Sequence, residues 1–464
     1  MKTIFALITL FIISVSAAAQ QTDLSALSKT ESGKRVLAYF AALNSGDDQK
    51  LRDFFSENVA AESLKQRPVE ARVEFHKRVR NDFPALEIKQ ISPVGDSEIK
   101  VLAQSKNGNW VAISFAFENQ TQKINGMGID PADAPNSTEN PKYNPPTNKA
   151  EFLSTVEKFL NDKVAADEFS GVVLIAEKDK PVFSKAYGLA NREKNLANKS
   201  DTKFNLGSIN KIFTRIAIGQ LVQQGKISFD DKIGKILPDY PNKDVAEKVT
   251  IRHLVTMTSG IGDIFNDKFD ALREKLRTNA DYLPLFASNP LEFEPGTSQR
   301  YSNGSYVLLG AIIEKVSGKS YYDYVRENIF KVAGMSNTES FEADKMPSNA
   351  AEGYTKRNPS AKWTNNLSTR PMRGSAAGGG YSTSEDLLKF SMALQGGKLT
   401  IPDDNGQPQK EVRTGVAGGA DGINALLLVN GQTGYTIIVL SNYDPPSAEK
   451  VGTQLRDWLK QIQQ

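Results

Sequence analysis

The stretch FNLGSINKIFTRIAIGQLVQ, residues 204–223, joins a serine–lysine pair to a long apolar pattern. Ser208 and Lys211 are three residues apart, and the apolar residues that follow have helical spacing: Ile212, Phe213, Ile216, Ala217, Leu221 and Val222. This periodicity predicts a largely buried helix with Ser208 in its first turn. Residues three apart lie on one face of a helix, so the Lys211 amine would be within reach of the Ser208 hydroxyl.

Such a pair can support nucleophilic catalysis. A serine hydroxyl needs an adjacent base, and a lysine can serve when burial or a nearby cation lowers its pKa from ~10.4. The spacing alone is weak, because it recurs at Ser97/Lys100, Ser200/Lys203 and Ser447/Lys450. A serine that only caps a helix, with its lysine in water, is the competing interpretation.

Other stretches distinguish Ser208 from these repeats of the spacing. Residues 293–304, FEPGTSQRYSNG, follow the serine by about ninety positions and precede a second apolar helical pattern. Three further stretches follow the same order along the chain: VTIRHLVTMTSGI (249–261), AGGGYSTSEDL (377–387) and IVLSN (438–442). His253, in the first of these, sits in an amphipathic pattern typical of a structural histidine.

Taken together, these ordered motifs resemble the serine beta-lactamase and penicillin-binding-protein family, in its class C beta-lactamase, esterase and D-aminopeptidase branch. The resemblance spans residue 151 to the C-terminus. It implies that Ser208 is the nucleophile and that Tyr301 shares the role of general base with Lys211. It also implies that Asn303 binds the amide of the substrate and Lys211, with no cofactor and no metal.

The third motif of that family departs from its pattern here. The family carries K-T-G or H-x-G on the strand beside the serine, where the cation supports the substrate's carboxylate. Counting back from Ser441-Asn442 aligns Val416-Ala417-Gly418 with it, which puts Val416 at the cationic position. The alternative register, Arg413-Thr414-Gly415, preserves a cation. With Val416 there, catalysis is weakened or the substrate lacks a carboxylate, and the backbone near Gly418 and Gly419 would help to hold the oxyanion.

Composition narrows the chemistry. The 464 residues include no Cys and only two His, which excludes thiol nucleophiles, disulfides, zinc–cysteine sites and histidine-rich metal sites. Lys plus Arg (57) nearly balance Asp plus Glu (54), giving a net charge of +3 with no block of like sign. Nucleic acid is therefore not suggested as a partner.

The chain is expected to have four parts. Residues 1–20 have a positive start, an apolar run and three small residues, the pattern of a cleaved secretory signal, and no segment is long enough to span a membrane. Residues 130–148 hold five prolines and predict a semi-rigid linker. It separates residues 22–129 from residues 149–464.

In the first domain, two helical patterns precede strands near residues 86–91, 99–103 and 110–117, which predicts an α+β fold. Its layout resembles the nuclear transport factor 2-like cone. His76 lies in the charged stretch 72–80 and is predicted to be on a solvated helix face. The domain is therefore expected to serve binding, dimerisation or spacing.

In the second domain, a helix at 151–164 precedes strands at 171–176 and 182–188, and strands at 423–429 and 435–440 precede a helix at 447–462. A sheet built from both ends of one domain, with helices between, predicts an α/β layered architecture with an antiparallel sheet and a helical region.

These expectations combine into one functional hypothesis. It is a secreted or periplasmic serine hydrolase that acts on small esters or D-amino-acid peptides and forms a homodimer through its N-terminal domain. The alternatives are a catalytically impaired binding protein of the same fold, or a beta-lactamase or D-Ala carboxypeptidase.

Overall fold

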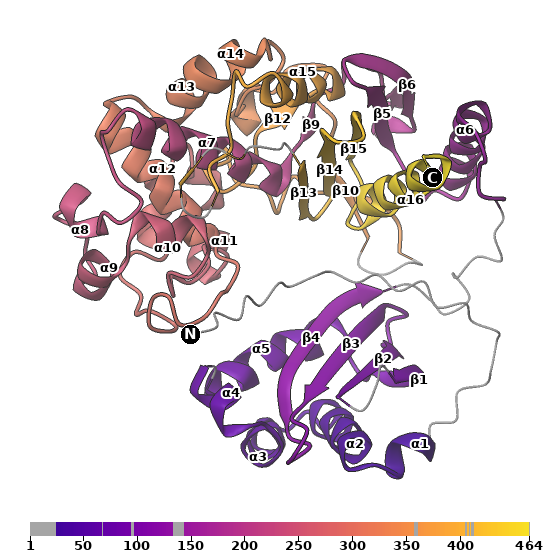
Figure 1. Ribbon diagram of the computed structural model, residues 1–464, viewed down its shortest axis with the longest axis vertical. Coiled ribbons are helices and arrows are strands. Elements are labelled where there is room, and N and C mark those ends of the chain that lie inside the picture. Colours follow the sequence, from indigo (N-terminus) through magenta and orange to yellow (C-terminus); the bar gives the residue numbers. More distant parts are fainter. Residues whose placement is uncertain are drawn as a thin grey trace. The chain divides into compact units, whose positions relative to one another are not determined.

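The computed structural model describes residues 25–66, 68–93, 97–132, 143–356, 361–403, 406–407, 409 and 413–463. The chain forms two compact units that divide between Glu139 and Asn140 (Figure 1). This division falls within the predicted linker. Much of that linker, and all of the predicted signal segment at residues 1–20, lie outside the described residues.

The N-terminal unit has an α+β fold, as predicted, in which helices precede an antiparallel meander (Figure 1). Its helices are α1 (Ser25–Ser28), α2 (Glu31–Asn44), α3 (Asp48–Asn58), α4 (Ala61–Gln66) and α5 (Val69–Asp82). Its strands pair in the order β1 (Glu87–Pro93), β2 (Glu98–Gln104), β3 (Trp110–Phe117) and β4 (Ile124–Ala132). Strand β4 was not predicted, because Gly126, Gly128 and Pro131 interrupt its apolar pattern.

The prediction that His76 is solvated is wrong. His76 is only 2% exposed, and its ring contacts those of Tyr39, Phe55 and Phe75 with centroids 4.7–5.5 Å apart. Its Nδ1 donates to the carbonyl of Arg72 at 2.7 Å. Val73, His76 and Val79 follow one another at intervals of three residues on one face of α5, and all are buried. Charged residues between them make this apolar face hard to recognise in the sequence.

The C-terminal unit is built on a five-stranded antiparallel sheet. Its strand order is β13 (Arg413–Ala420), β14 (Ile423–Asn430), β15 (Tyr435–Ser441), β5 (Gly171–Glu177) and β6 (Lys180–Tyr187). The last strand of the chain pairs with the first strand of the unit, Leu440 opposite Val172. The sheet therefore joins both ends of the domain, as predicted, and leaves β13 at one edge.

Both faces of this sheet are covered. Along β5, Val172 and Leu174 pack into the larger hydrophobic core, whereas Val173 and Ile175 pack into a second one. Helices α6 (Lys149–Ala165) and α16 (Ser447–Ile462) cover the second face (Figure 1). Burial on both sides explains why these strands are continuous apolar runs without alternation. Tyr143, at the described end of the predicted linker, packs against Phe159 and Trp458 in this core.

The helical region fills the chain between β6 and β13 and packs against the other face. Its α-helices are α7 (Asn210–Gln223), α8 (Ile233–Ile236), α9 (Lys243–Lys248), α10 (Ile251–Val255), α11 (Asp267–Leu272), α12 (Asn303–Ser317), α13 (Tyr321–Val325), α14 (Lys331–Ala333) and α15 (Ser384–Gln395). Short strand pairs join β7 (Leu189–Asn191) to β8 (Leu196–Ala197), β9 (Phe204–Asn205) to β12 (Tyr381–Ser382), and β10 (Tyr354–Thr355) to β11 (Thr364–Asn365).

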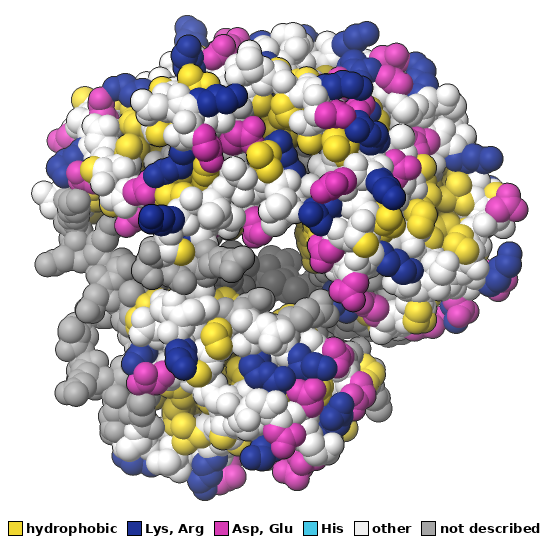
Figure 2. Space-filling view, turned by 180° about the vertical axis from the view of Figure 1, so that it is seen from behind, with side chains coloured by type: hydrophobic (Ala, Val, Ile, Leu, Met, Phe, Trp, Pro, Cys, Tyr) yellow, Lys and Arg dark blue, Asp and Glu magenta, His cyan; other side chains and the backbone are white. Residues whose placement is uncertain are grey.

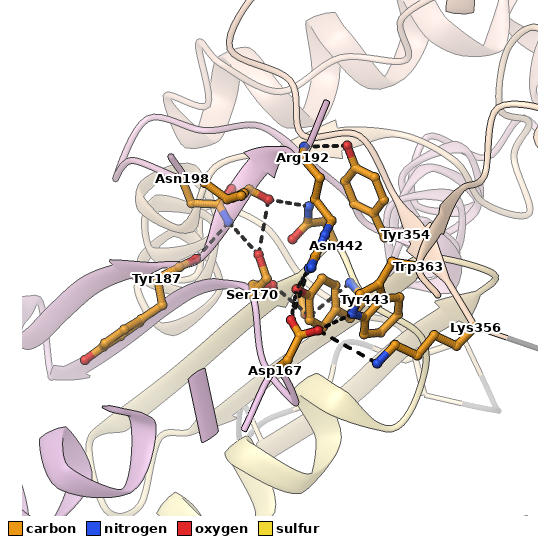
Figure 3. Close-up of polar contacts among 12 residues, drawn as sticks. Asp167, Ser170, Tyr187, Arg192, Asn198, Tyr354, Lys356, Trp363, Asn442 and Tyr443 are labelled. Carbon is orange, nitrogen blue, oxygen red and sulfur yellow. Dashed lines mark hydrogen bonds and ion pairs between the residues drawn. The ribbon is translucent and has the colours of Figure 1, made fainter. Parts of the chain in front are cut away.

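A polar cluster around Asp167 anchors the segment that follows β10 (Figure 3). The Asp167 carboxylate accepts hydrogen bonds from the Trp363 indole at 2.6 Å, the Tyr443 hydroxyl at 2.7 Å and the Arg192 guanidinium at 3.1 Å. The Trp363 ring also stacks on Tyr443, with centroids 3.9 Å apart. These contacts fix the chain just before Asn366 and Arg370, which line the cavity described below.

The molecular surface is mixed in charge. On the face shown in Figure 2, Lys and Arg side chains are interspersed with Asp and Glu. No helix within the described residues is long and apolar enough to cross a membrane.

Candidate active site

Ser208 lies where a short 3₁₀ turn, Gly207–Ile209, leads into α7. Lys211 follows one turn later on the same face, and its Nζ donates to the Ser208 Oγ at 3.1 Å. The lysine is buried, only 7% exposed, because α7 is apolar on nearly all sides. The geometry matches the reach expected from the three-residue spacing, and it disagrees with a lysine that points into water.

The Lys211 amine is held by two further acceptors. Its Nζ donates to Asn303 Oδ1 and to the Ala377 carbonyl, both at 2.6 Å, and lies 4.7 Å from the centroid of the Tyr301 ring. Burial lowers the pKa of Lys211 from 10.5 to about 7, and the negative charge of Asp263 opposes that shift. The three hydrogen bonds donated by Nζ use all three protons of the ammonium form. With its pKa near 7, Lys211 can lose one of these protons near neutral pH, and the lone pair of the neutral amine can then accept the proton of Ser208.

Tyr301 approaches the serine from the other side. Its hydroxyl lies 2.5 Å from the Ser208 Oγ, although half of the residue (50%) is exposed. Burial of the hydroxyl raises the pKa of Tyr301, and the hydrogen bond with Ser208 partly offsets this. The Ser208 hydroxyl therefore lies between an amine and a phenol, which gives its proton two destinations.

Asn303 contacts Lys211 directly, and Asp263 contacts Asn303. Asn303 begins α12, and its Nδ2 donates to both carboxylate oxygens of Asp263 at 3.0 and 3.1 Å, which directs its Oδ1 toward Lys211. Sequence reasoning missed Asp263. Asp263 lies three residues after Gly260, just beyond the stretch 249–261, and no local pattern marks it.

The edge strand β13 passes directly beside the serine. A Cβ on Gly418 would lie 2.0 Å from the Leu206 carbonyl and 2.7 Å from the Ser208 nitrogen. Gly207 has φ +49°, and a Cβ there would lie 3.0 Å from the Gly419 nitrogen. Side chains at these positions would force the two segments apart. The backbone nitrogens of Ser208 and Gly419 are consequently close enough together to serve a single anion.

Val416 lies two residues before Gly418 on the same strand, so the two residues face the same side of the sheet. It is partly buried and packs against the larger core. Arg413, from the alternative register, is at the far end of β13, where its backbone pairs with Asn430. The closeness of Gly418 to Ser208 favours the Val416 register.

His253 has a structural setting, as its sequence pattern predicted. In the first turn of α10 its Nδ1 accepts a hydrogen bond from the Thr250 backbone at 3.3 Å, while Thr250 caps the helix. Among the described residues, no three His, Cys, Asp or Glu side chains form a group able to hold a metal ion.

A cavity of about 920 Å³ opens beside Ser208 and Tyr301. This volume is typical of a site for a small molecule. One part of its wall is apolar: Ile264, Phe265, Phe269, Tyr282, Phe341 and Met346. Another part contains Ala417, Gly419 and Ala420 from β13 and Glu449 from α16. The site can thus place an apolar group and a reacting carbonyl next to the serine.

Comparison with known proteins covers the C-terminal unit. The model of the family described as Beta-lactamase matches residues 156–460. A penicillin-binding protein of Bacillus subtilis is 35% identical over 199 residues, which are 42% of this chain and 42% of that protein. The chain spans 42%, 56% and 62% of the lengths of three curated relatives.

Solved structures give the same picture. A penicillin-binding protein from Bacillus halodurans is 31% identical, with a TM-score of 0.56 over 64% of this chain and 99% of that one. A D-amino acid amidase from Ochrobactrum anthropi, solved with L-phenylalanine, is 22% identical, with a TM-score of 0.53 over 68% of this chain and 98% of that one. The latter likeness shows the fold alone.

Proposed function

Because this chain belongs to the beta-lactamase family, whose members are serine hydrolases, we propose that it works through an acyl-enzyme on small esters or D-amino-acid peptides and amides. One observation carries the proposal. The Ser208 hydroxyl is held between the neutralisable amine of Lys211 and the hydroxyl of Tyr301, at the wall of a cavity.

In the proposed mechanism the Ser208 Oγ attacks the substrate carbonyl and forms the C–O bond of a tetrahedral intermediate. Its proton passes to Lys211 or Tyr301 and then to the leaving alcohol or amine as the scissile bond breaks. The backbone N–H groups of Ser208 and Gly419 stabilise the oxyanion. Water then attacks the acyl-enzyme, gives its proton to the same pair, and releases the acid with Ser208 restored.

Substrate choice follows from the wall of the cavity. Ala417 lines the cavity without a hydroxyl, Val416 beside it on β13 carries no cation, and another part of the wall is apolar. Esters and amides without a carboxylate at this position are therefore favoured over beta-lactams and D-Ala-D-Ala termini, which carry one. Purified protein should hydrolyse a nitrophenyl ester faster than a chromogenic cephalosporin, and the opposite order would overturn this ranking.

The nucleophile is tested by substitution. Ser208→Ala should remove nitrophenyl ester hydrolysis, while Ser200→Ala, in another S-x-x-K stretch, should retain the parent rate. Each variant should keep the parent thermal midpoint, which shows that it is folded. Full activity in Ser208→Ala would refute the assignment.

Val416 favours a second candidate, a binding protein that keeps this fold without efficient chemistry. The intact set of Ser208, Lys211, Tyr301 and Asn303 argues against it. Val416→His separates the two: a large gain in rate identifies an impaired site, whereas an unchanged or lower rate supports an enzyme adapted to Val416.

Export and dimerisation belong to the same proposal. The pattern of residues 1–20 supports cleavage and a periplasmic or secreted mature protein. The N-terminal unit, with its separate core, is proposed to form a homodimer. The N-terminus of the mature protein, and light scattering on the full mature chain, test these two points.

A further inference from the structure

Glu449 is an acidic residue on the wall of the cavity that the proposed mechanism does not use. It lies in the first turn of α16, where its neighbours Ala448 and Val451 are buried in the core. It shares the cavity with Ser208, Tyr301 and Gly419. A carboxylate here borders the same cavity as the serine.

The orientation of Glu449 is fixed by Asn424 on β14. Asn424 Oδ1 accepts from the backbone nitrogens of Ala448 at 2.5 Å and Glu449 at 3.2 Å. Its Nδ2 must therefore point the other way, and it donates to Glu449 Oε2 at 2.8 Å and to the Gly418 carbonyl at 3.2 Å. One amide thus ties the carboxylate to the part of β13 that lies beside Ser208.

This carboxylate lacks a counter-charge. Among the described residues, none forms an ion pair with Glu449; its one side-chain partner is neutral Asn424. Burial raises the pKa of Glu449, and the Asn424 hydrogen bond lowers it. A partly buried carboxylate with one neutral partner is costly, and a cationic ligand would offset that cost.

The two arginines on the cavity wall do not supply this charge. Arg370 lies 3.6 Å from Glu352, and Arg373 lies 3.9 Å from Glu339. On β13, Val416 and Ala417 replace the first two residues of K-T-G. β13 therefore brings no cation to the wall near Gly419, and α16 places the carboxylate of Glu449 in the same cavity.

We infer that Glu449 selects substrates with an ammonium group at the position where lactam substrates carry their carboxylate. This inference rests on the proposed function, since it assigns a substrate class to the same site. The ammonium would donate to the carboxylate of Glu449 while the carbonyl lies against Ser208 and Gly419.

Binding to the full-length Ser208→Ala variant tests the inference without any turnover. The probes are 3-phenylpropylamine, 3-phenylpropanol and 4-phenylbutanoate, which share a 3-phenylpropyl group and differ in the charge of the group at its end. Calorimetry should show the ammonium binding about tenfold more tightly than the alcohol, as a charge-assisted hydrogen bond would give. The carboxylate should bind more weakly than the alcohol.

Adding Glu449→Gln to the Ser208→Ala variant keeps a hydrogen-bond acceptor for Asn424 and removes the negative charge of the carboxylate. The preference for the ammonium should fall about tenfold while the affinity of the alcohol stays unchanged, which shows that the pocket is intact. Glu385→Gln, which changes an exposed glutamate in the first turn of α15, is the matched control and should leave the preference unchanged.

Two results would overturn the inference: equal binding of the three probes, or an ammonium preference that survives Glu449→Gln. Failure of the proposed function is separate, because it would appear as absent ester hydrolysis in the parent protein whatever the probes do.

Discussion

Two opposing effects set the pKa of Lys211, the proposed base. Burial lowers the pKa of Lys211 to about 7. The negative charge of Asp263 favours the protonated amine, and Asn303 lies between the two residues, hydrogen-bonded to both. Since only the neutral amine can accept the Ser208 proton, turnover should rise as pH increases through about 7 and be lost below it.

Asp263→Asn tests that balance at the residue scale. Removing the negative charge lowers the pKa of Lys211 further, so the acid limb of the kcat/KM profile should move to lower pH. Asp267→Asn, which changes an exposed carboxylate nearby, should leave the limb in place. A limb that stays fixed in Asp263→Asn, or moves to higher pH, would contradict this account of the lysine.

The hydroxyl of Tyr301 is a second residue-scale test. Tyr301→Phe keeps the ring near Lys211 and removes the group 2.5 Å from Ser208, so kcat should fall about 10²- to 10³-fold. Tyr306→Phe is the control, because its ring also lies near Lys211 but its hydroxyl donates to the Val255 carbonyl. Comparable losses in both variants would point to packing instead of proton transfer.

Whether a site residue can be predicted from the sequence depends on whether local structure or tertiary packing places it in the site. Ser208 and Lys211 share a helix face, so their spacing predicts that the two side chains meet, although the other motifs were needed to distinguish this pair from the other S-x-x-K stretches. Tyr301 and Asn303 were found through the resemblance. Asp263 and Glu449 reach the site only through tertiary packing, which no local pattern encodes. His76 was mispredicted because the charges beside it outweighed the three-residue spacing of its buried neighbours.

At the scale of elements, the approach of β13 to the start of α7 should determine whether the site can hold an oxyanion. Gly418→Ala would bring a Cβ against the Leu206 carbonyl and push the strand from Ser208, so kcat/KM should fall about 100-fold or more. Gly415→Ala is on the same strand, where a Cβ meets only the flexible end of Leu428, and should change little. Full activity in Gly418→Ala would exclude β13 from the oxyanion site.

Buried strands and helices were predicted more accurately than the edge strand β13. β5, β14 and β15 were visible as apolar runs because both sides of the sheet are covered, and α16 was predicted at its observed bounds, Ser447–Ile462. The last four residues of β13 are all alanine or glycine, so the strand shows no apolar pattern. Its position could be inferred only from the third motif, which left two registers open.

At the scale of the whole molecule, the two units have separate cores. Tyr39, Phe55 and Phe115 belong to one, and Phe213 and Phe390 to another. The N-terminal unit and the C-terminal unit should therefore unfold as distinct calorimetric transitions.

Core substitutions assign those transitions. Phe55→Ala should cost the N-terminal unit about 3–5 kcal/mol and leave ester hydrolysis unchanged. Phe213→Ala should lower the other transition and reduce activity with it. A single transition that shifts in both variants would show that the units unfold as one.

The central claim is that Ser208 is an activated nucleophile. The measurement that tests it most directly is the intact mass, with peptide mapping, of the purified protein after exposure to a broad serine-reactive fluorophosphonate. The account predicts one adduct, on Ser208, that disappears in Lys211→Ala. A folded protein that gains no adduct, or gains one on another serine, would contradict it.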